Sequence, residues 1–360
     1  MALQTHPTHY PTPAAPEPRD IRELMLDELE QFVVAAGERA FRAHQVMGWL
    51  WRRGATDFDA MSDLPAEFRE YLKKHFKINP IPNAAVARSA DGTRKLLVAL
   101  VDGEAIETVI IPAGERVTLC LSSQCGCAMA CEFCATARMG LHRNLSAAEI
   151  VSQVAAARRA LAPGEELTNY VFMGMGEPLA NYPRLARALR IMTSAWGMGI
   201  SPRRITVSSV GLVPAMERLL TEFPSINLAV SLHATADETR DRLAPINRRY
   251  PLAALIETCR RLPIKRRDRI TFEYVMLAGV NDGPDDARRL VRMLGPLRAK
   301  VNLIFFNRFA GASFTPSPRA AVEGFQAILR QGNLTATVRE SRGGDIAAAC
   351  GQLYAERQRA

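Results

Sequence analysis

Five of the chain's seven cysteines lie between Cys120 and Cys134, and the other two are Cys259 and Cys350. A cysteine thiolate is both a soft metal ligand and the nucleophilic form of the side chain, so this group suits metal or redox chemistry. A secreted disulfide scaffold would be a smaller protein with its cysteines spread along the chain. We therefore expect a metal or redox site in a cytoplasmic protein.

Cys127, Cys131 and Cys134 form a compact set with the spacing C-x3-C-x2-C. Three thiolates on one short segment can hold three irons of a [4Fe–4S] cluster and leave the fourth iron open to a small molecule. Ferredoxin-type electron carriers use a fourth cysteine, whereas an open iron suits radical chemistry with S-adenosylmethionine. A tetrahedral zinc site is the alternative, but it usually takes four ligands in two separated pairs, and no histidine lies at that spacing.

The elements that must position these cysteines change in character along the chain. Residues 1–20 carry five prolines and little apolar content, which predicts a disordered tail and no signal peptide. Residues 21–85 have apolar side chains at helical spacing and predict a small helical accessory domain. Two strand-like runs separated by Asp102 and Gly103 predict a β-hairpin linker over residues 86–115.

From residue 116 onward the sequence alternates between strands and helices. This alternation predicts βαβ units and a parallel sheet, but about six units are too few for a closed eight-stranded barrel. We therefore expect an open or partial α/β barrel over residues 116–343, followed by a C-terminal segment, 344–360. Capping boxes are predicted at Ser146 with Glu149 and at Thr235 with Glu238. The expected strands are 117–122, 169–175, 204–210, 226–232, 270–277, 300–306 and 334–339.

Nine longer motifs accompany the cysteines: FRAHQVMGWLWRRG, ETVIIP, CLSSQCGCAMACEFCATARMG, FMGMGEPLANY, SPRRITVSSVGLVP, SLHATADETRDRLAPIN, FEYVMLAGVND, NLIFFN and RGGDIAAACGQLY. With these motifs the chain resembles the radical S-adenosylmethionine (SAM) superfamily and, within it, the RlmN/Cfr family of RNA adenine methyltransferases. The resemblance covers nearly the whole chain from about Asp20. It implies a partial (β/α)6 barrel of the radical SAM type and one [4Fe–4S] cluster on Cys127, Cys131 and Cys134.

Polar residues end several of the predicted parallel strands, where ligands bind in such sheets. The resemblance implies that Gly176 and Glu177 hold the amino group of SAM. It assigns further residues to the ribose, carboxylate and adenine of the same cofactor, and we interpret His233 as a hydrogen-bonding residue and not a metal ligand. These further residues are Ser208, Ser231, Leu232, His233 and Asn307.

The resemblance also implies a catalytic role for two cysteines outside the cluster set. One SAM methylates the sulfur of Cys350, and a second is cleaved to a radical that removes hydrogen from this S-methyl group. The carbon then adds to an electron-poor adenine carbon, which is no nucleophile and so cannot take a methyl group by polar transfer. Cys120 resolves the adduct through a transient disulfide with Cys350, and Glu107 accepts a proton.

The implied substrates are an adenine in the peptidyl transferase region of 23S rRNA and an adenine next to the tRNA anticodon. The net charge of +9 suits a polyanion, and Arg39, Arg42, Arg52 and Arg53 are predicted to form part of an RNA-docking surface. We further expect a cytoplasmic monomer with no membrane span and with a reductant such as flavodoxin for the cluster.

Two alternatives to methylation of adenine C2 stay open. One is Cfr-like methylation of adenine C8 in 23S rRNA, which confers antibiotic resistance, and the other is a non-methylating iron–sulfur RNA-binding protein. Pro178 resembles the C2-modifying branch, whereas Cys125 resembles the C8-modifying branch; by itself Cys125 is interpreted as a buried bystander, like Cys259. Phe305 and Arg308 replace prolines common in the family, so the loop near Asn307 is expected to differ.

Overall fold

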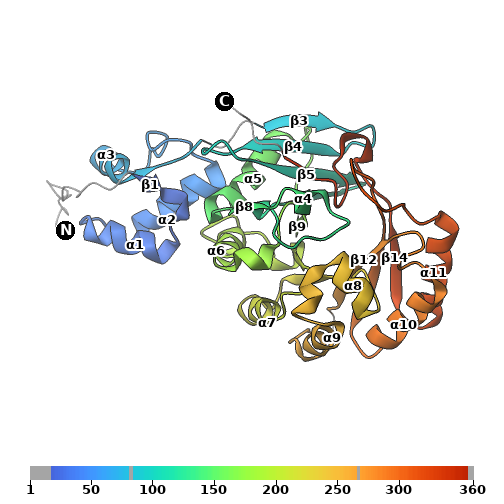
Figure 1. Ribbon diagram of the computed structural model, residues 1–360. Coiled ribbons are helices and arrows are strands. Elements are labelled where there is room, and N and C mark those ends of the chain that lie inside the picture. The colour runs from blue at the N-terminus through green and yellow to red at the C-terminus, as the bar shows by residue number, and fades with distance from the viewer. Residues whose placement is uncertain (1–17, 81–83, 266–267, 356–360) are drawn as a thin grey trace. The chain divides into compact units, whose positions relative to one another are not determined.

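The computed structural model describes residues 18–80, 84–265 and 268–355 (Figure 1). The chain divides into two compact units. The first comprises residues 1–82, 146–156 and 183–201, and the second comprises residues 83–145, 157–182 and 202–360. Most of the predicted disordered tail, residues 1–17, lies outside the described residues. The domain boundaries drawn from the sequence remain predictions.

The first unit is helical, as the apolar spacing of its sequence predicts. Leu29 and Val33 are fully buried on one face of its first helix, and Phe32 stacks on Tyr71 with ring centroids 5.6 Å apart. A short parallel pair of strands, which the sequence did not indicate, ties the two ends of this region together. Its elements are β1 (Arg19–Asp20), α1 (Leu26–Ala35), α2 (Phe41–Gly48), η2 (Trp49–Arg53), α3 (Ala66–His75) and β2 (Phe76–Lys77), with most of α5 (Ala147–Arg159) and α6 (Tyr182–Thr193).

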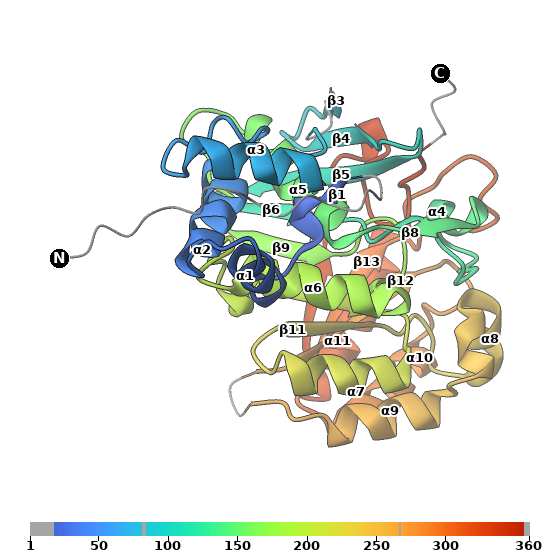
Figure 2. The same ribbon diagram turned by 90° about the vertical axis from the view of Figure 1, so that its left-hand side faces the viewer.

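The second unit is built on a sheet of ten strands. Seven of them are parallel neighbours in chain order, which confirms the predicted partial α/β barrel. Because crossovers between parallel strands are right-handed, this order puts the connecting helices that belong to this unit on one face of the sheet (Figure 2). The strands are β6 (Arg116–Cys120), β9 (Asn169–Phe172), β10 (Ile205–Ser209), β11 (Asn227–Ser231), β12 (Ile270–Met276), β13 (Ala299–Phe305) and β14 (Thr335–Arg339).

The helices of this unit pack on the barrel through apolar side chains. Phe172 and Phe272 are fully buried on strands of the sheet, and the rings of Tyr274 and Phe325 lie 5.3 Å apart between β12 and a helix. Among the described residues, no helix is long and apolar enough to cross a membrane. The helices are α7 (Val213–Glu222), α8 (Asp237–Leu243), α9 (Leu252–Arg261), α10 (Pro284–Leu294) and α11 (Arg319–Gln331).

The predicted hairpin is confirmed as β4 (Arg94–Ala99) and β5 (Ala105–Ala113), which pair antiparallel. Gly103 in its loop has φ 80°, a conformation that glycine adopts without strain. A third strand, β3 (Ala84–Arg88), pairs with β4 and was not predicted, because its mostly exposed residues show no apolar alternation. β5 pairs with β6, so the hairpin continues the barrel sheet.

One predicted capping box is confirmed and the other is wrong. Ser146 N donates to Glu149 Oε2 (2.9 Å), and Glu149 N donates to Ser146 Oγ (3.2 Å). Thr235 instead donates its hydroxyl to Asp286 Oδ1 (2.7 Å), and α8 begins two residues later with no side-chain cap. A tertiary partner on α10 thus replaces the local cap that the spacing suggested.

Candidate active site

Cys127, Cys131 and Cys134 lie on the loop between β7 (Gln124–Gly126) and α4 (Ala135–Arg138). Gly126 has φ 74°, and a side chain there would collide with the carbonyl oxygen of Gly140. Only glycine therefore lets β7 approach the next turn closely enough for Cys127 N to donate to Gly140 O (2.7 Å). Cys134 N donates to Cys131 O (3.1 Å), which turns the two thiols toward one space.

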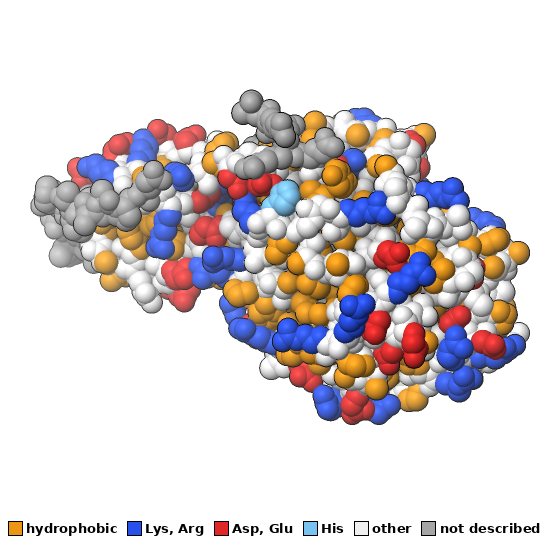
Figure 3. Space-filling model, in the orientation of Figure 1, with side chains coloured by type: hydrophobic (Ala, Val, Ile, Leu, Met, Phe, Trp, Pro, Cys, Tyr) orange, Lys and Arg blue, Asp and Glu red, His pale blue; other side chains and the backbone are white. Residues whose placement is uncertain are grey.

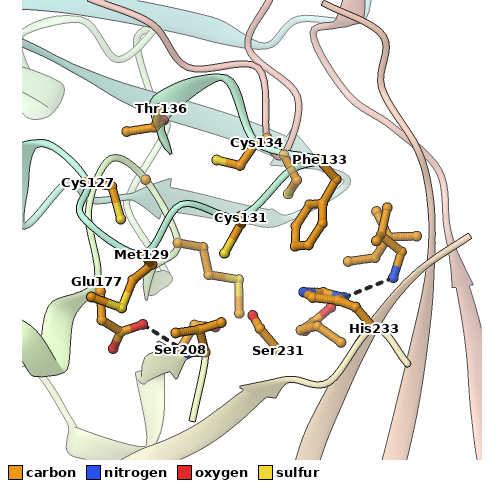
Figure 4. Close-up of a pocket in the computed structure, with 18 of the residues that line it drawn as sticks. Cys127, Met129, Cys131, Phe133, Cys134, Thr136, Glu177, Ser208, Ser231 and His233 are labelled. Carbon is orange, nitrogen blue, oxygen red and sulfur yellow. Dashed lines mark hydrogen bonds between the residues drawn. The ribbon is translucent and has the colours of Figure 1, made fainter. Parts of the chain in front are cut away.

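The three thiols line one wall of a pocket of about 970 Å³, counting the space open to solvent. In Figure 4 their sulfur atoms face the pocket from above, and Phe133 stands beside Cys131. Burial raises the pKa of Cys127 to about 12 and the pKa of Cys131 well above its usual value. The neighbouring thiols raise both values further, because each added negative charge disfavours the next thiolate.

This donor set fits an iron–sulfur cluster. Thiolates that repel one another in a buried pocket become stable when a cationic metal group takes the place of their protons. Within residues 18–80, 84–265 and 268–355, no three His, Cys, Asp or Glu side chains converge on one metal ion. Ligands of a cluster bind separate irons and lie farther apart than ligands of one ion.

Glu177 lies on the opposite wall of the pocket, at the end of β9 (Figure 4). Its Oε2 accepts from Val210 N (2.9 Å), and its Oε1 accepts from Leu179 N (3.1 Å). Burial raises the pKa of Glu177 to about 7, against these hydrogen bonds. Its own backbone N donates to Gln124 Oε1 (2.8 Å), so β7 also positions this turn. Gly176 has φ 95°, and a side chain there would collide with Gln124.

Ser208, Ser231 and His233 line the same wall from the ends of β10 and β11. His233 Nδ1 accepts from Val275 N (3.1 Å), and its ring meets Phe133 edge-on at 4.5 Å between centroids. The hydrogen-bonding interpretation of His233 agrees with this contact. Leu232 is fully buried and is not among the residues that line the pocket.

Cys120 and Cys350 line a second pocket, which shares Cys350 with the first. Both are free thiols. Burial, and after it the neighbouring Cys350, raises the pKa of Cys120 to about 12. Asn307, predicted to contact the cofactor, lines this second pocket, and its Nδ2 donates to Cys350 O (3.1 Å).

Glu107 lies on β5, and the structure does not bring it among the residues that line either pocket. Its Oε1 is 2.7 Å from Lys95 Nζ, and its Oε2 accepts from Tyr354 N (2.9 Å). Burial raises the pKa of this carboxyl, and the Lys95 ammonium opposes the rise. Glu107 therefore holds the C-terminal segment close behind Cys350.

The same segment is fixed from the cluster loop. Thr136 donates its hydroxyl to Leu353 O (2.7 Å), and Ala135 N donates to Gly351 O (2.7 Å). Cys350 thus begins a C-terminal strap, residues 350–354, to which α4 and Glu107 both form hydrogen bonds. Sequence spacing gave no sign of these contacts, because the partners are more than two hundred residues apart.

The sequence reasoning missed three residues, of which two line the pockets and one supports a pocket residue. Arg339, at the end of β14, lines both pockets, and the charges of Cys350, Glu273 and Cys120 raise its pKa. Glu273 lines the first pocket from the middle of β12. Gln124 holds Glu177 in place. A charged residue inside an otherwise apolar strand was the signal available for Glu273.

The arginines expected at an RNA-docking surface lie in the first unit. Arg42 donates to Gln45 Oε1 (2.8 Å), Arg52 donates to a backbone carbonyl, and Arg53 Nη1 is 3.5 Å from an oxygen of Asp63. Arg39 is exposed. Three of the four therefore already have protein partners, and their contact with RNA remains a prediction.

Comparison with known proteins agrees with this site. Residues 19–78 match the ribosomal RNA large subunit methyltransferase N-terminal domain, and residues 121–293 match the radical SAM superfamily. A Geobacter sulfurreducens protein named dual-specificity RNA methyltransferase RlmN is 52% identical over 334 residues, which cover 93% of this chain and 91% of the relative. The chain belongs to the RlmN family of radical SAM RNA methyltransferases.

Two further similar proteins support the same assignment. A relative of that name from an Anaeromyxobacter species is 51% identical and covers 96% of this chain and 93% of its own. The crystal structure of a radical SAM methyltransferase from Sphaerobacter thermophilus has 47% identity and a TM-score of 0.88, covering 94% of this chain and all of that one. Membership implies a [4Fe–4S] cluster and SAM as cofactors, and so decides against zinc.

Proposed function

We propose that this enzyme methylates C2 of an adenine in 23S rRNA, at the peptidyl transferase centre, and C2 of an adenine next to the anticodon of tRNA. One observation carries the proposal: Cys350 lines both the pocket of Cys127, Cys131 and Cys134 and the pocket of Cys120. A single sulfur at this junction can take a methyl group on one side and present it to RNA on the other.

Cys127, Cys131 and Cys134 would hold one cluster per chain, and Gly176 and Glu177 would hold the amino end of SAM. When bound, these groups supply the methyl group and the radical that activates it, with two SAM consumed for each methylation. The Glu177 carboxylate suits an ammonium ligand because a nearby cation lowers its raised pKa and restores its charge.

Cys350 and Cys120 would have different roles in the second pocket, Cys350 as the carrier of the methyl group and Cys120 as the thiol that releases the product. The Cys350 sulfur acts as a nucleophile and accepts a methyl group. The carbon of this methyl group later bonds to the adenine. Once the adduct has returned the one electron that SAM cleavage consumed, the Cys120 thiolate would attack the Cys350 sulfur. A disulfide forms, the bond between that sulfur and the transferred carbon breaks, and the carbon takes up a proton to become the methyl group. Glu107 accepts the proton that leaves the adenine ring, and the cytoplasmic thiol pool reduces the disulfide.

The second pocket also suits an RNA substrate. Arg116 and Arg342 line it beside Cys120, and cations at this entrance favour the phosphates of a nucleotide. The relatives that the chain resembles carry the name dual-specificity RNA methyltransferase, which supports both rRNA and tRNA as substrates. We place the enzyme in the cytoplasm as a monomer that receives electrons from a reductant such as flavodoxin.

Nucleoside mass spectrometry of rRNA and tRNA from cells with and without the gene tests the proposal. We expect 2-methyladenosine in both RNA classes only when the gene is present. Appearance of 8-methyladenosine would instead establish the C8 alternative, and the absence of any gene-dependent methyladenosine would leave only an RNA-binding protein. A gene encoding the Cys350→Ala variant serves as the control for indirect effects of the deletion.

A further inference from the structure

Glu273 is a buried carboxyl inside the barrel with one oxygen unused. Its Oε1 accepts from Asn302 Nδ2 (2.9 Å). Its Oε2 is buried and has no hydrogen-bond partner in the described part of the chain. The residue lines the first pocket. A buried carboxyl oxygen without a donor is costly, so a residue of this kind in a ligand pocket points to a donor on the ligand.

The sheet register fixes which oxygen of Glu273 stays unused. Ser231, Glu273, Asn302 and Thr337 are direct neighbours on β11, β12, β13 and β14. Thr337 donates its hydroxyl to Asn302 Oδ1 (2.6 Å), which leaves only the NH₂ group of Asn302 for Glu273. That group occupies Oε1. This polar row therefore holds the Glu273 carboxyl rigidly and leaves Oε2 for the pocket.

No protein charge takes this oxygen. Burial raises the pKa of Glu273, and the charge of Arg339 is the largest influence that lowers it. Within the described ranges, however, no hydrogen bond from a cation reaches Glu273 Oε2. Arg339 lines the same pocket, so a bound ligand can reach the side chains of both Glu273 and Arg339.

The chemistry of the pocket narrows the donor. Glu177 and the three cysteines account for the amino end of SAM and for the cluster, which leaves the adenosine moiety for the remaining wall. A carboxyl beside the hydroxyl of Ser231 matches the vicinal hydroxyl groups of a ribose, which carboxylates bind in other nucleotide sites. We propose that Glu273, with Ser231 beside it, binds a ribose hydroxyl of an adenosine moiety.

This inference rests on the proposed function, because it takes the occupant of the pocket to be an adenosyl compound. Two sources present that ribose: SAM and the target adenosine of the RNA. The structure favours SAM, because Glu273 and Ser231 line the pocket of the cluster cysteines and are not among the residues that line the pocket of Cys120.

The test measures affinities and not turnover. Equilibrium dialysis of the holoenzyme compares S-adenosylhomocysteine with its 2′-deoxy and 3′-deoxy analogues. For the wild-type protein we expect at least one analogue to bind about tenfold more weakly, as loss of one hydrogen bond to a charged group predicts. In Glu273→Leu this ratio of affinities should fall well below the wild-type ratio, because the hydroxyl group has lost its charged partner and keeps at most Ser231.

A second variant protects the test against misfolding. Glu273→Gln keeps an oxygen for Asn302 but replaces Oε2 with an NH₂ group, which cannot accept a hydrogen bond. The ratio of its affinities for S-adenosylhomocysteine and the deoxy analogue should therefore also fall below the wild-type ratio. Glu104→Gln is the matched control: Glu104 is a buried carboxylate bonded to His142 outside both pockets, and its ratio should equal the wild-type ratio.

A second arm separates the two sources of the ribose. Binding of a short RNA hairpin with 2′-deoxyadenosine at the target position is compared with binding of the all-ribose hairpin. In one outcome the wild type prefers the all-ribose hairpin, and Glu273→Leu abolishes this preference while leaving the ratio for S-adenosylhomocysteine unchanged. That result would assign the bound ribose to the RNA. If Glu273→Leu and Glu273→Gln keep the wild-type ratios in both arms, the inference is overturned. If the wild type does not bind S-adenosylhomocysteine at all, the proposed function itself fails.

Discussion

The two groups of cysteines in the second unit differ in how the fold assembles them. Cys127, Cys131 and Cys134 occupy one short loop, and the turn at Gly126 brings them to a common wall. Cys120 and Cys350 come from a strand and from a distant C-terminal strap, and only tertiary contacts bring them to one pocket. A single loop is enough to bring the first group together, whereas the second group meets only when the barrel has folded.

This difference explains where sequence reasoning succeeds. The face shown in Figure 3 carries basic and acidic side chains side by side, so charge alone does not reveal where the cysteines lie. Spacing alone indicated the cluster loop, because three ligands within eight residues have few other uses. Nothing in spacing links Cys120 to Cys350, and only resemblance to a family suggested that they act together. The predictions below test whether the two groups are separable in function.

The largest effect is expected when each group loses one sulfur. Cys131→Ala should lose the cluster and all methyl transfer, since two thiolates cannot hold the iron. Cys350→Ala should keep the cluster, because Cys350 is not a predicted ligand. Its rate of RNA methylation should fall at least about a thousandfold, as expected when a nucleophile is removed. Iron content, visible absorbance and methyl incorporation into RNA distinguish these cases. A cluster lost in Cys350→Ala would show that the groups are not separable.

Cys120→Ala should stop the reaction one step later. The variant keeps Cys350 and should still acquire its methyl group, but it lacks the thiol that breaks the bond between enzyme and RNA. We therefore expect a covalent RNA–protein adduct to accumulate, visible as a shifted band in a denaturing gel. Cys259→Ala, a buried cysteine outside both pockets, should release its product normally. Free methylated RNA from Cys120→Ala at the wild-type rate would remove Cys120 from the mechanism.

Glu177→Gln tests the first pocket alone. The neutral amide cannot pair with an ammonium group, so the affinity for S-adenosylhomocysteine should fall about tenfold to a hundredfold. Oxidation of Cys120 and Cys350 to a disulfide by a mild oxidant should be unchanged, because those thiols meet in the other pocket. Glu238→Gln, an exposed change on α8, is the control. Unchanged affinity in Glu177→Gln would mean that the amino group binds elsewhere.

The smallest effect concerns the buried imidazole of His233. Burial, and after it the charge of Arg240, lowers its pKa from 6.5 to about 3. Below pH 6.5 the unfolded chain takes up a proton that the folded chain refuses, so stability present above pH 6.5 is lost as the pH falls toward 3. Between pH 7.5 and 5 this amounts to about 2 kcal/mol.

Urea unfolding of the apoprotein at these two pH values measures this loss. His233→Gln should lose about 2 kcal/mol less than the wild type, whereas His142→Gln, an exposed change, should lose as much as the wild type. Equal losses in all three proteins would mean that His233 is protonated in the folded state.

Much of the fold could be predicted from sequence, and the exceptions have physical causes. Strand and helix alternation gave the partial barrel, and the hairpin followed from Asp102 and Gly103. β3 was not predicted, because it pairs through its backbone and its sequence shows no apolar pattern. The box at Thr235 failed because Asp286 offered its hydroxyl a better partner than the local backbone.

The site was predicted less completely than the fold. Residues within a motif, such as Glu177 and Ser231, line the pocket, and their contact with the cofactor remains a prediction. Glu273 and Arg339 were missed, because the sequence does not show which face of the sheet a strand residue occupies until the register is known. The cofactor role of Asn307 also remains a prediction, and in the structure its Nδ2 donates to the backbone of Cys350. Contacts across the barrel decide these cases.

The central claim is that Cys350 carries the methyl carbon before RNA receives it. Holoenzyme with an unlabelled methyl group on Cys350 is freed of SAM, then mixed with RNA, a reductant and SAM labelled with ¹³C in its methyl group, and sampled from the first turnover onward. Mass spectrometry of the nucleosides should show unlabelled 2-methyladenosine first and labelled product only in later turnovers. Label in the first product would contradict the claim, because the carbon would then have bypassed Cys350.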